Sequence, residues 1–261
     1  MSEEQEKLKV SLLQANLFWE DPEQNKAYFS SQLKDLYNTT DLVILAEMFT
    51  TGFSMNPQNL AEDSNIYQYL QNHAAAGNFA IYGSVMFQKE EGGYVNRGIF
   101  MSPDGNYTIY DKRHTFTLAG EQKVYDPGDR PVIAIYKGWK FNLQICYDLR
   151  FPVFSRNTQD YDAVIYVANW PVPRVNAWDA LLKARAIENM SYAIGVNRVG
   201  KDGTGMDYNG HSQVYDVLGK ELISHPWKTS GIENITLDKA HIEHYRNKLK
   251  FLHDRDSFSL D

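Results

Sequence analysis

The chain has 261 residues, of which 43% are hydrophobic and 23% charged, a composition typical of a folded protein rather than a disordered one. Its net charge of −7 argues against a surface for nucleic acids or acidic membranes, because such a surface needs basic clusters. One cysteine excludes an internal disulfide, and no segment approaches the ~20 apolar residues of a membrane span. Residues 1–7 are mostly Glu, Gln and Lys and fit neither a signal nor a transit peptide, so we expect a soluble cytoplasmic protein.

The first half of the chain alternates expected strands with expected helices. Asp21 followed by Pro22 is typical of a helix start, with Asp21 as the N-cap. The run 41–46 (DLVILA) is short and nearly continuous in apolar residues, which predicts a strand buried on both faces. The turn 102–106 (SPDGN) indicates a hairpin. The expected strands are 8–14, 41–46, 79–87, 94–101 and 107–110, and the expected helices begin at Pro22 and Ile66, the second ending near Gly77.

The second half continues this alternation. The run 163–168 (AVIYVA) again predicts a buried strand, and Ala177 and Leu181 then recur at helical spacing. Asp238 is placed to cap a last helix. The expected strands are 132–136, 140–145, 163–168, 192–197, 212–217, 221–224 and 232–237.

No internal repeat, low-complexity tract or linker divides the sequence. We therefore expect one domain over residues 1–261, with mixed sheets covered by helices in an α/β fold and a C-terminal tail at 251–261. Gly200, Gly203 and Gly205 form a glycine-rich loop, but no Gly-Lys-Ser/Thr follows, so it does not predict a phosphate site. A hairpin loop beside a ligand site is the better interpretation.

Four polar or reactive residues stand where predicted strands end. They are Glu47, Lys112, Cys146 and Asn169. In open α/β sheets, ligands collect at the carboxyl ends of the strands. A carboxylate can take the proton of a nearby thiol, and an ammonium group can favour the thiolate and stabilise an oxyanion; the thiolate is the form that attacks a carbonyl. The set therefore indicates nucleophilic catalysis.

Each of these residues also has a plainer interpretation. A lone cysteine such as Cys146 more often packs as a small hydrophobic side chain. Glu47 could be a surface acid, and Lys112 lies in the charged stretch 111–114 (DKRH), where a solvated face is the ordinary expectation. No local motif joins the three, so their spacing alone does not decide between chemistry and packing.

Longer motifs in the same order resemble those of the nitrilase superfamily of carbon–nitrogen hydrolases. The segment 146–152 (CYDLRFP) is similar to its nucleophile motif, 46–53 (AEMFTTGF) to its glutamate motif and 110–116 (YDKRHTF) to its lysine motif. The resemblance runs from about Gln14 to the last strands, and it is strongest to the omega-amidase branch. Further matching segments are 166–171 (YVANWP), 185–189 (RAIEN) and 209–220 (NGHSQVYDVLGK).

The resemblance implies a role for each motif residue. Cys146 would be the nucleophile, Glu47 the general base and Lys112 the oxyanion stabiliser, with the backbone N–H of Tyr147 as a second oxyanion donor. Glu121 fits the second glutamate that the superfamily often carries, although it could be an ordinary loop acid. The implied reaction is amide hydrolysis through a thioester, and it needs neither a metal nor an organic cofactor.

The implied substrates are monoamides of short dicarboxylates, such as 2-oxoglutaramate and 2-oxosuccinamate. Their free carboxylate needs a cation or amide donors, for which Arg113, Arg174 and Trp170 are candidates because they lie beside Lys112 or the ANWP segment. Each of the three could instead be structural.

Two other arginines lie in these motifs. We expect Arg150 and Arg185 to be structural ion-pair partners, with Asp148 or Glu188 as the acid. Neither is predicted to bind substrate.

At the level of the whole molecule, the resemblance implies a four-layer α-β-β-α sandwich and a homodimer joined through a helical face. Two alternatives to the omega-amidase function remain. One is a sibling activity on N-carbamoyl or other aliphatic amides. The other is a non-catalytic binding protein on the same scaffold, against which the intact Glu47, Lys112 and Cys146 argue.

Overall fold

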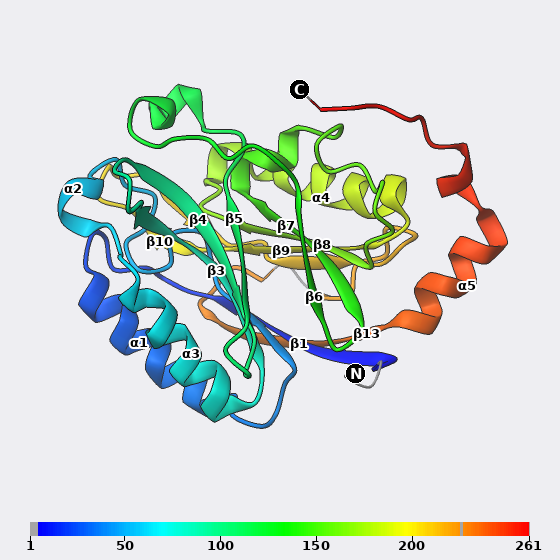
Figure 1. The fold of residues 1–261 in the computed structure, drawn as a ribbon, viewed down its shortest axis with the longest axis horizontal. Coiled ribbons are helices and arrows are strands. Elements are labelled where there is room, and N and C mark those ends of the chain that lie inside the picture. Colours follow the sequence, from blue (N-terminus) through cyan, green and yellow to red (C-terminus); the bar gives the residue numbers. More distant parts are fainter. Residues whose placement is uncertain (1–4, 225–226, 261) are drawn as a thin grey trace.

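Two β-sheets lie face to face, and helices cover the outer side of each. The computed structural model describes residues 5–224 and 227–260. Figure 1 shows the resulting four layers, in the order α-β-β-α. The four-layer sandwich expected from the sequence is confirmed.

The first sheet draws its strands from both ends of the chain. These elements are β1 Lys7–Gln14, β2 Leu42–Ile44, β3 Ala80–Gln88, β4 Tyr94–Met101, β5 Tyr107–Asp111 and β13 Gly231–Asp238, with helices α1 Pro22–Asp35, α2 Pro57–Leu60 and α3 Asn65–Gly77. The strand order is β13-β1-β2-β3-β4-β5. β1, β2 and β3 are parallel, and the other neighbours are antiparallel. Helices α1 and α3 lie on the outer face.

The second sheet comes from the middle of the chain. Its elements are β6 Val132–Tyr136, β7 Trp139–Ile145, β8 Ala163–Ala168, β9 Tyr192–Asn197 and β12 Gln213–Tyr215, with helix α4 Val175–Asn189 on the outer face. The order is β12-β9-β8-β7-β6, and β7, β8 and β9 are parallel. In both sheets the parallel strands therefore occupy the middle, where their carboxyl ends share one edge.

Three apolar layers hold the sandwich together. Tyr82 and Phe141 belong to the central core between the sheets. Leu70 of α3 packs on the first sheet, and Trp178 and Leu182 of α4 pack on the second. The strand that the sequence predicts at 163–168 is buried at all six positions, because one of its faces meets the central core and the other meets α4.

The predicted strand 221–224 is wrong. Glu221 forms only an isolated bridge with Tyr215. The side-chain amide of Gln213 takes the place of a strand partner, because it accepts from the backbone N–H of Ile223 and donates to the Ile223 carbonyl, both at 2.9 Å.

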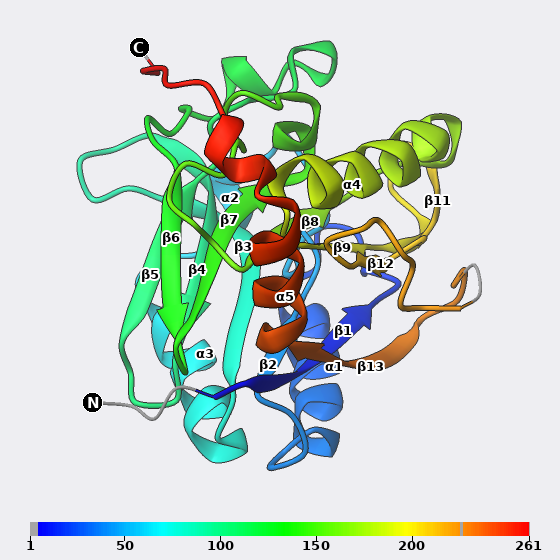
Figure 2. The same ribbon diagram turned by 90° about the vertical axis from the view of Figure 1, so that its right-hand side faces the viewer.

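The predicted capping role of Asp238 is also wrong. Helix α5 spans Lys239–Leu249, and Asp238 occupies the N-cap position, but its side chain accepts no capping hydrogen bond. The N–H of Lys239 bonds instead to the carbonyl of Glu6 at 2.8 Å, so a neighbouring segment already satisfies this donor. In Figure 2, α5 stands across one edge of the sandwich, where Ile242 enters the central core.

The glycine-rich loop forms a small hairpin of β10 Val199–Lys201 and β11 Asp207–Asn209. Two of its glycines allow it to pack against the loop that follows β1. A Cβ atom at Gly200 would lie 2.0 Å from Oδ1 of Asn16, and one at Gly203 would lie 2.2 Å from Nε1 of Trp19. Neither position has room for a side chain, so the hairpin is held close to this loop.

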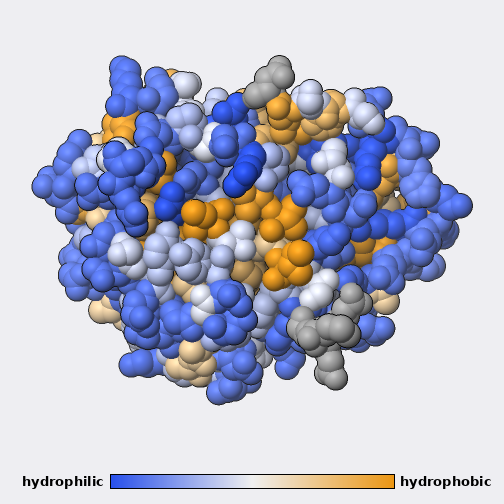
Figure 3. All heavy atoms as spheres, viewed as in Figure 1, coloured by the Kyte–Doolittle hydropathy of each residue, from blue (hydrophilic) through white to orange (hydrophobic). Residues whose placement is uncertain are grey.

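The face of the molecule seen in Figure 3 is mostly polar, with a local apolar area where the two sheets meet. Figure 3 shows apolar side chains over the face on which β5 and β6 lie, and Ile109 and Ile135 are exposed there. Over the described residues, no helix has the length and apolar character needed to cross a bilayer.

Candidate active site

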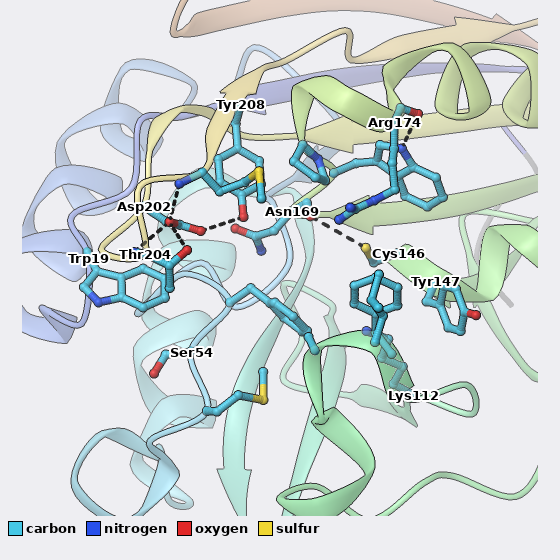
Figure 4. A pocket seen from close by; sticks show the side chains of 18 of the residues that line it. Trp19, Ser54, Lys112, Cys146, Tyr147, Asn169, Arg174, Asp202, Thr204 and Tyr208 are labelled. Carbon is cyan, nitrogen blue, oxygen red and sulfur yellow. Dashed lines mark hydrogen bonds between the residues drawn. The ribbon is translucent and has the colours of Figure 1, made fainter.

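The polar residues predicted at strand ends come together at one end of the sandwich. Glu47 follows β2 closely, Lys112 follows β5, Cys146 follows β7 and Asn169 follows β8. The first two belong to the first sheet and the last two to the second, so the group spans both sheets. Figure 4 shows Cys146 and Lys112 on one side of a cavity, across from Asp202 and Tyr208 of the hairpin.

A buried ion cluster forms the base of this site. The ammonium group of Lys112 lies 2.9 Å from Oε1 of Glu47 and 3.0 Å from both carboxylate oxygens of Glu121. The three side chains are at most 1% exposed. Burial alone would lower the pKa of Lys112, but the charges of Glu121 and Glu47 outweigh it and raise that pKa. Lys112 is therefore a fixed cation beside the thiol.

Glu121 is held by more than its ion pair. Its Oε2 accepts the backbone N–H of Phe116, and its Oε1 lies 3.5 Å from the amide nitrogen of Asn96. Burial raises the pKa of Glu121, Lys112 lowers it, and the nearby charge of Glu47 raises it again, so the net direction is upward. Two carboxylates thus share one ammonium group in a dry environment.

The hydrogen bonds of Glu47 leave one of its carboxylate oxygens better able than the other to accept a further proton. Oε1 accepts from Lys112 and, at 2.9 Å, from Nδ2 of Asn96. Oε2 accepts the backbone N–H of Asn169 at 2.8 Å, and the Asn169 amide is more distant at 3.4 Å. Oε2 thus has one close donor where Oε1 has two, so Oε2 is the oxygen better placed to accept a further proton.

Cys146 stands in a strained turn. It begins the 3₁₀ turn Cys146–Arg150 directly after β7, and its φ of +45° lies in the left-handed region. Non-glycine residues adopt this region at a cost of about 1–3 kcal/mol and often do so at functional sites. The sulfur lies 4.0 Å from the carbonyl oxygen of Asn169.

The surroundings of Cys146 favour its protonated thiol over the thiolate. Burial raises its pKa well above the ordinary value, and the charge of its hydrogen-bond partner Glu47 raises it further, while Lys112 lowers it. Lys112 favours the thiolate, as the sequence predicts, but burial and Glu47 act in the opposite direction and set the net direction of the pKa. Glu47 is thus near enough to the thiol to accept its proton.

The cavity above this group has a volume of about 540 Å³. Its inner end holds Lys112, Cys146 and Asn169, and its outer part is mostly aromatic, apolar or charged. Arg150 lies with its guanidinium 4.9 Å from the ring centroid of Trp170, and Arg174 lies 5.2 Å from that of Phe116. The other lining residues include Trp19, Glu20, Phe53, Met55, Asp202, Thr204, Met206 and Tyr208.

The predicted carboxylate-binding residues separate into two groups. Arg174 and Trp170 line the cavity, although Trp170 is only 3% exposed and its indole N–H donates to the Arg174 carbonyl. Arg113 is not among the lining residues, and its guanidinium donates to the carbonyl of Gly128. The structure thus places Arg113 outside the cavity lining, because the chain turns after Lys112, and gives its predicted contact with the substrate no support.

The two arginines expected to be structural also differ from each other. Arg185 pairs with Glu188 at 2.8 Å, as predicted. Arg150 is exposed, lines the cavity and makes no ion pair with Asp148, which binds His114 instead. The prediction for Arg150 is thus wrong, because the turn that begins at Cys146 brings its last residue back to the cavity.

Several residues of the site carry no recognisable signal in the sequence. Asn96 lies inside β4, where the sequence indicates only an ordinary polar residue of a strand. Its side-chain amide nevertheless donates a hydrogen bond to Glu47. Trp19 and the hairpin residues reach the cavity only because the hairpin packs on the loop after β1. The position of a buried asparagine beside Glu47 follows from pairing between strands, which one sequence does not reveal.

The chain belongs to the carbon–nitrogen hydrolase family, whose model matches residues 9–247. It is 42% identical to omega-amidase YafV of Escherichia coli K12 over 97% of this chain and 98% of that protein. It is 28% identical to the 2-oxoglutaramate amidase of Bacillus subtilis over 94% and 96% of the two chains. The crystal structure of XC1258 from Xanthomonas campestris, a CN-hydrolase superfamily protein with an arsenic adduct in its active site, has a TM-score of 0.95 and 39% identity, covering 98% of this chain and 100% of that one.

Proposed function

We propose that this protein is an omega-amidase that hydrolyses the terminal amide of short dicarboxylate monoamides, with 2-oxoglutaramate as the leading substrate. The observation that carries the proposal is one cavity whose lining includes the Cys146 thiol, Lys112 of the buried Glu–Lys–Glu cluster and two arginines. Membership of the carbon–nitrogen hydrolase family and the similarity to proteins named omega-amidase and 2-oxoglutaramate amidase support it.

In the first half of the reaction, Cys146 becomes acylated. Glu47 takes the thiol proton through Oε2 while the sulfur attacks the amide carbon, and a tetrahedral oxyanion forms. The Lys112 ammonium group and the backbone N–H of Tyr147 stabilise this oxyanion; each well-placed donor contributes about 3–4 kcal/mol in other enzymes. Glu47 then passes its proton to the amide nitrogen, the C–N bond breaks, and ammonia leaves with the acyl group held as a thioester.

The second half of the reaction restores the thiol. Glu47 takes a proton from water as the water oxygen attacks the thioester carbon, and the same donors hold the second oxyanion. The C–S bond breaks, the carboxylic acid leaves, and the proton returns from Glu47 to sulfur. Glu121 keeps Lys112 in place during both halves, because it holds the ammonium group with both carboxylate oxygens.

Arg150 and Arg174 give the site its preference for an anionic substrate. Among the described residues, neither guanidinium has a carboxylate partner, and each rests on an aromatic face instead. A guanidinium is well suited to hold a carboxylate through two hydrogen bonds. A monoamide that spans the cavity can therefore place its amide at Cys146 and its carboxylate at these arginines.

A substrate panel tests the proposal. Ammonia release is measured for 2-oxoglutaramate, 2-oxosuccinamate, a neutral aliphatic amide and an N-carbamoyl amino acid. We expect the two oxo-acid monoamides to be hydrolysed fastest, and intact-mass measurement should show an acyl adduct on Cys146. Fast carbamoyl hydrolysis without turnover of 2-oxoglutaramate would favour the sibling activity, and no adduct or turnover with any substrate would favour a binding protein.

We also propose that the chain forms one domain that assembles as a homodimer through the face carrying α4. The apolar side chains of Ile187 and Leu218 are 45% and 46% exposed there, and Gly219 lies against Ile187. Light scattering should give a mass twice the 30.0 kDa of the chain.

We also propose that the protein is located in the cytoplasm. Cell fractionation should then recover it in the cytoplasmic fraction.

A further inference from the structure

Asp148 is a buried acid that the mechanism above does not use. It lies two residues after Cys146, is 0% exposed and does not line the cavity. Its carboxylate accepts four hydrogen bonds: from the backbone N–H of Ile145 at 2.9 Å, the hydroxyl of Tyr110 at 2.7 Å, and the backbone N–H and the ring Nδ1 of His114 at 3.0 and 2.8 Å. A carboxylate offers about four acceptor positions, so all of them are in use.

These donors come from the two segments that carry the reacting groups. Tyr110 and His114 stand two residues before and two residues after Lys112, at the end of β5 in the first sheet. Ile145 directly precedes Cys146, at the end of β7 in the second sheet. One carboxylate thus connects the lysine segment to the nucleophile segment across the gap between the sheets.

Both connected segments need such support. Cys146 has a left-handed backbone, which the surrounding structure must impose because a free cysteine does not favour it. The His114 ring stacks on Phe151, with centroids 3.7 Å apart and planes at 4°, so the lysine segment also contacts the far end of the nucleophile turn. The turn is therefore fixed at its start through Asp148 and at its end through His114.

We propose that Asp148 is a positioning residue, which holds the Lys112 ammonium group and the Cys146 sulfur in the relation needed to act on one carbonyl group. It does not touch the substrate. Small displacements matter at this point, since an error of about 1 Å in the placement of reacting groups can reduce the rate about 10²-fold. Of the two measurements that test this role, the rate of amide hydrolysis rests on the proposed function, whereas the rate at which Cys146 is alkylated does not.

Three variants test the proposal: Asp148→Asn, Tyr110→Phe and His114→Phe. The last two each remove one donor and keep an aromatic ring in place. For 2-oxoglutaramate, we expect kcat to fall about 100-fold in Asp148→Asn and about tenfold in each of the others, with KM within about twofold of wild type. The rate at which iodoacetamide alkylates Cys146 should fall in the same order, because the sulfur loses its fixed direction.

Tyr161→Phe is the matched control. Tyr161 is also a buried tyrosine, and its hydroxyl donates to the Ser155 carbonyl at 2.6 Å, outside the cavity. This variant should lose stability comparable to that of Tyr110→Phe and keep both wild-type rates. If Tyr110→Phe and His114→Phe keep the wild-type kcat and alkylation rate, Asp148 has no positioning role. The same conclusion follows if kcat and the alkylation rate fall as far in Tyr161→Phe as in those two variants. A lowered alkylation rate in a protein that never hydrolyses 2-oxoglutaramate would support the positioning role and contradict the proposed substrate.

Discussion

The inner cluster of the cavity (Glu47, Lys112, Glu121 and Cys146) and its arginine mouth (Arg150 and Arg174) hold their charges in different ways. In the inner cluster, each charge has a charged partner within 3.0 Å and is almost fully buried. At the mouth, the guanidinium groups lie on the rings of Trp170 and Phe116 and remain open to a ligand. The inner cluster is complete before the substrate arrives, whereas neither arginine of the mouth has a carboxylate partner among the described residues.

This difference assigns separate tasks to the two regions. A buried, fully bonded cluster suits a reaction in which charge develops at one fixed point, because its dipoles need no rearrangement. A cation on an aromatic face has lost part of its hydration and gains a partner when a carboxylate binds. We therefore expect changes in the inner cluster to affect kcat and changes at the mouth to affect KM.

The largest effect should come from the nucleophile itself. Cys146→Ala removes the atom that forms the thioester in the proposed mechanism, so amide hydrolysis should fall roughly 10⁴-fold or more. Single-turnover ammonia release measures the loss. An unchanged amidase rate in this variant would show that the inner cluster takes no part in the reaction.

The two glutamates of the inner cluster should differ from each other. Glu47→Gln removes the proton acceptor and should lower kcat about 10³-fold. Glu121→Gln leaves the base in place and only weakens the hold on Lys112, so a fall of about 10²-fold is expected. Steady-state kinetics with 2-oxoglutaramate compare the two, and KM should change little. Equal losses would mean that Glu121 also handles a proton.

At the mouth, Arg150→Ala and Arg174→Ala should each raise KM for 2-oxoglutaramate about tenfold, equivalent to about 1.4 kcal/mol. Their kcat should stay near wild type, and hydrolysis of a neutral aliphatic amide should be unaffected. Arg113→Ala is the matched control, since that guanidinium bonds the Gly128 carbonyl outside the cavity. A fall in kcat with an unchanged KM would contradict the assignment of substrate binding to the mouth and of catalysis to the inner cluster.

The smallest effect concerns the thiol. Its pKa in the folded protein is raised by burial and by Glu47, so the folded state keeps a proton that the unfolded state releases above about pH 8.5. The free energy of unfolding should therefore fall as the pH rises through that value. Denaturant titrations of wild type and Cys146→Ser, at about pH 7 and about pH 10, isolate this contribution. A wild-type protein that gains stability over Cys146→Ser at high pH would indicate a resting thiolate.

Sequence patterns predict the parts of this protein that depend on neighbouring residues. The strands around 41–46 and 163–168 and the helix start at Asp21 are confirmed, because apolar runs and local capping determine them. Motif resemblance led to Glu47, Lys112 and Cys146, which lie together in the structure.

Features that depend on distant segments were missed or assigned wrongly. The contact of Asn96 with Glu47 follows from the position of β4 in the sheet. The positions of Arg113 and Arg150 depend on how the turns after β5 and β7 close. The outer wall of the cavity depends on two segments that lie 181 residues apart and pack on each other, which no local pattern indicates.

The hairpin of β10 and β11 has a consequence for how such enzymes diverge. Its attachment depends on Gly200 and Gly203, where only hydrogen fits against Asn16 and Trp19. Its contribution to the cavity comes from other positions, among them Thr204 and Met206. Attachment and selectivity are thus encoded by different residues of one short loop. Evolution, or an engineer, can exchange the side chains at these cavity positions to admit another acyl chain while the loop keeps its place and the chemistry below it stays intact.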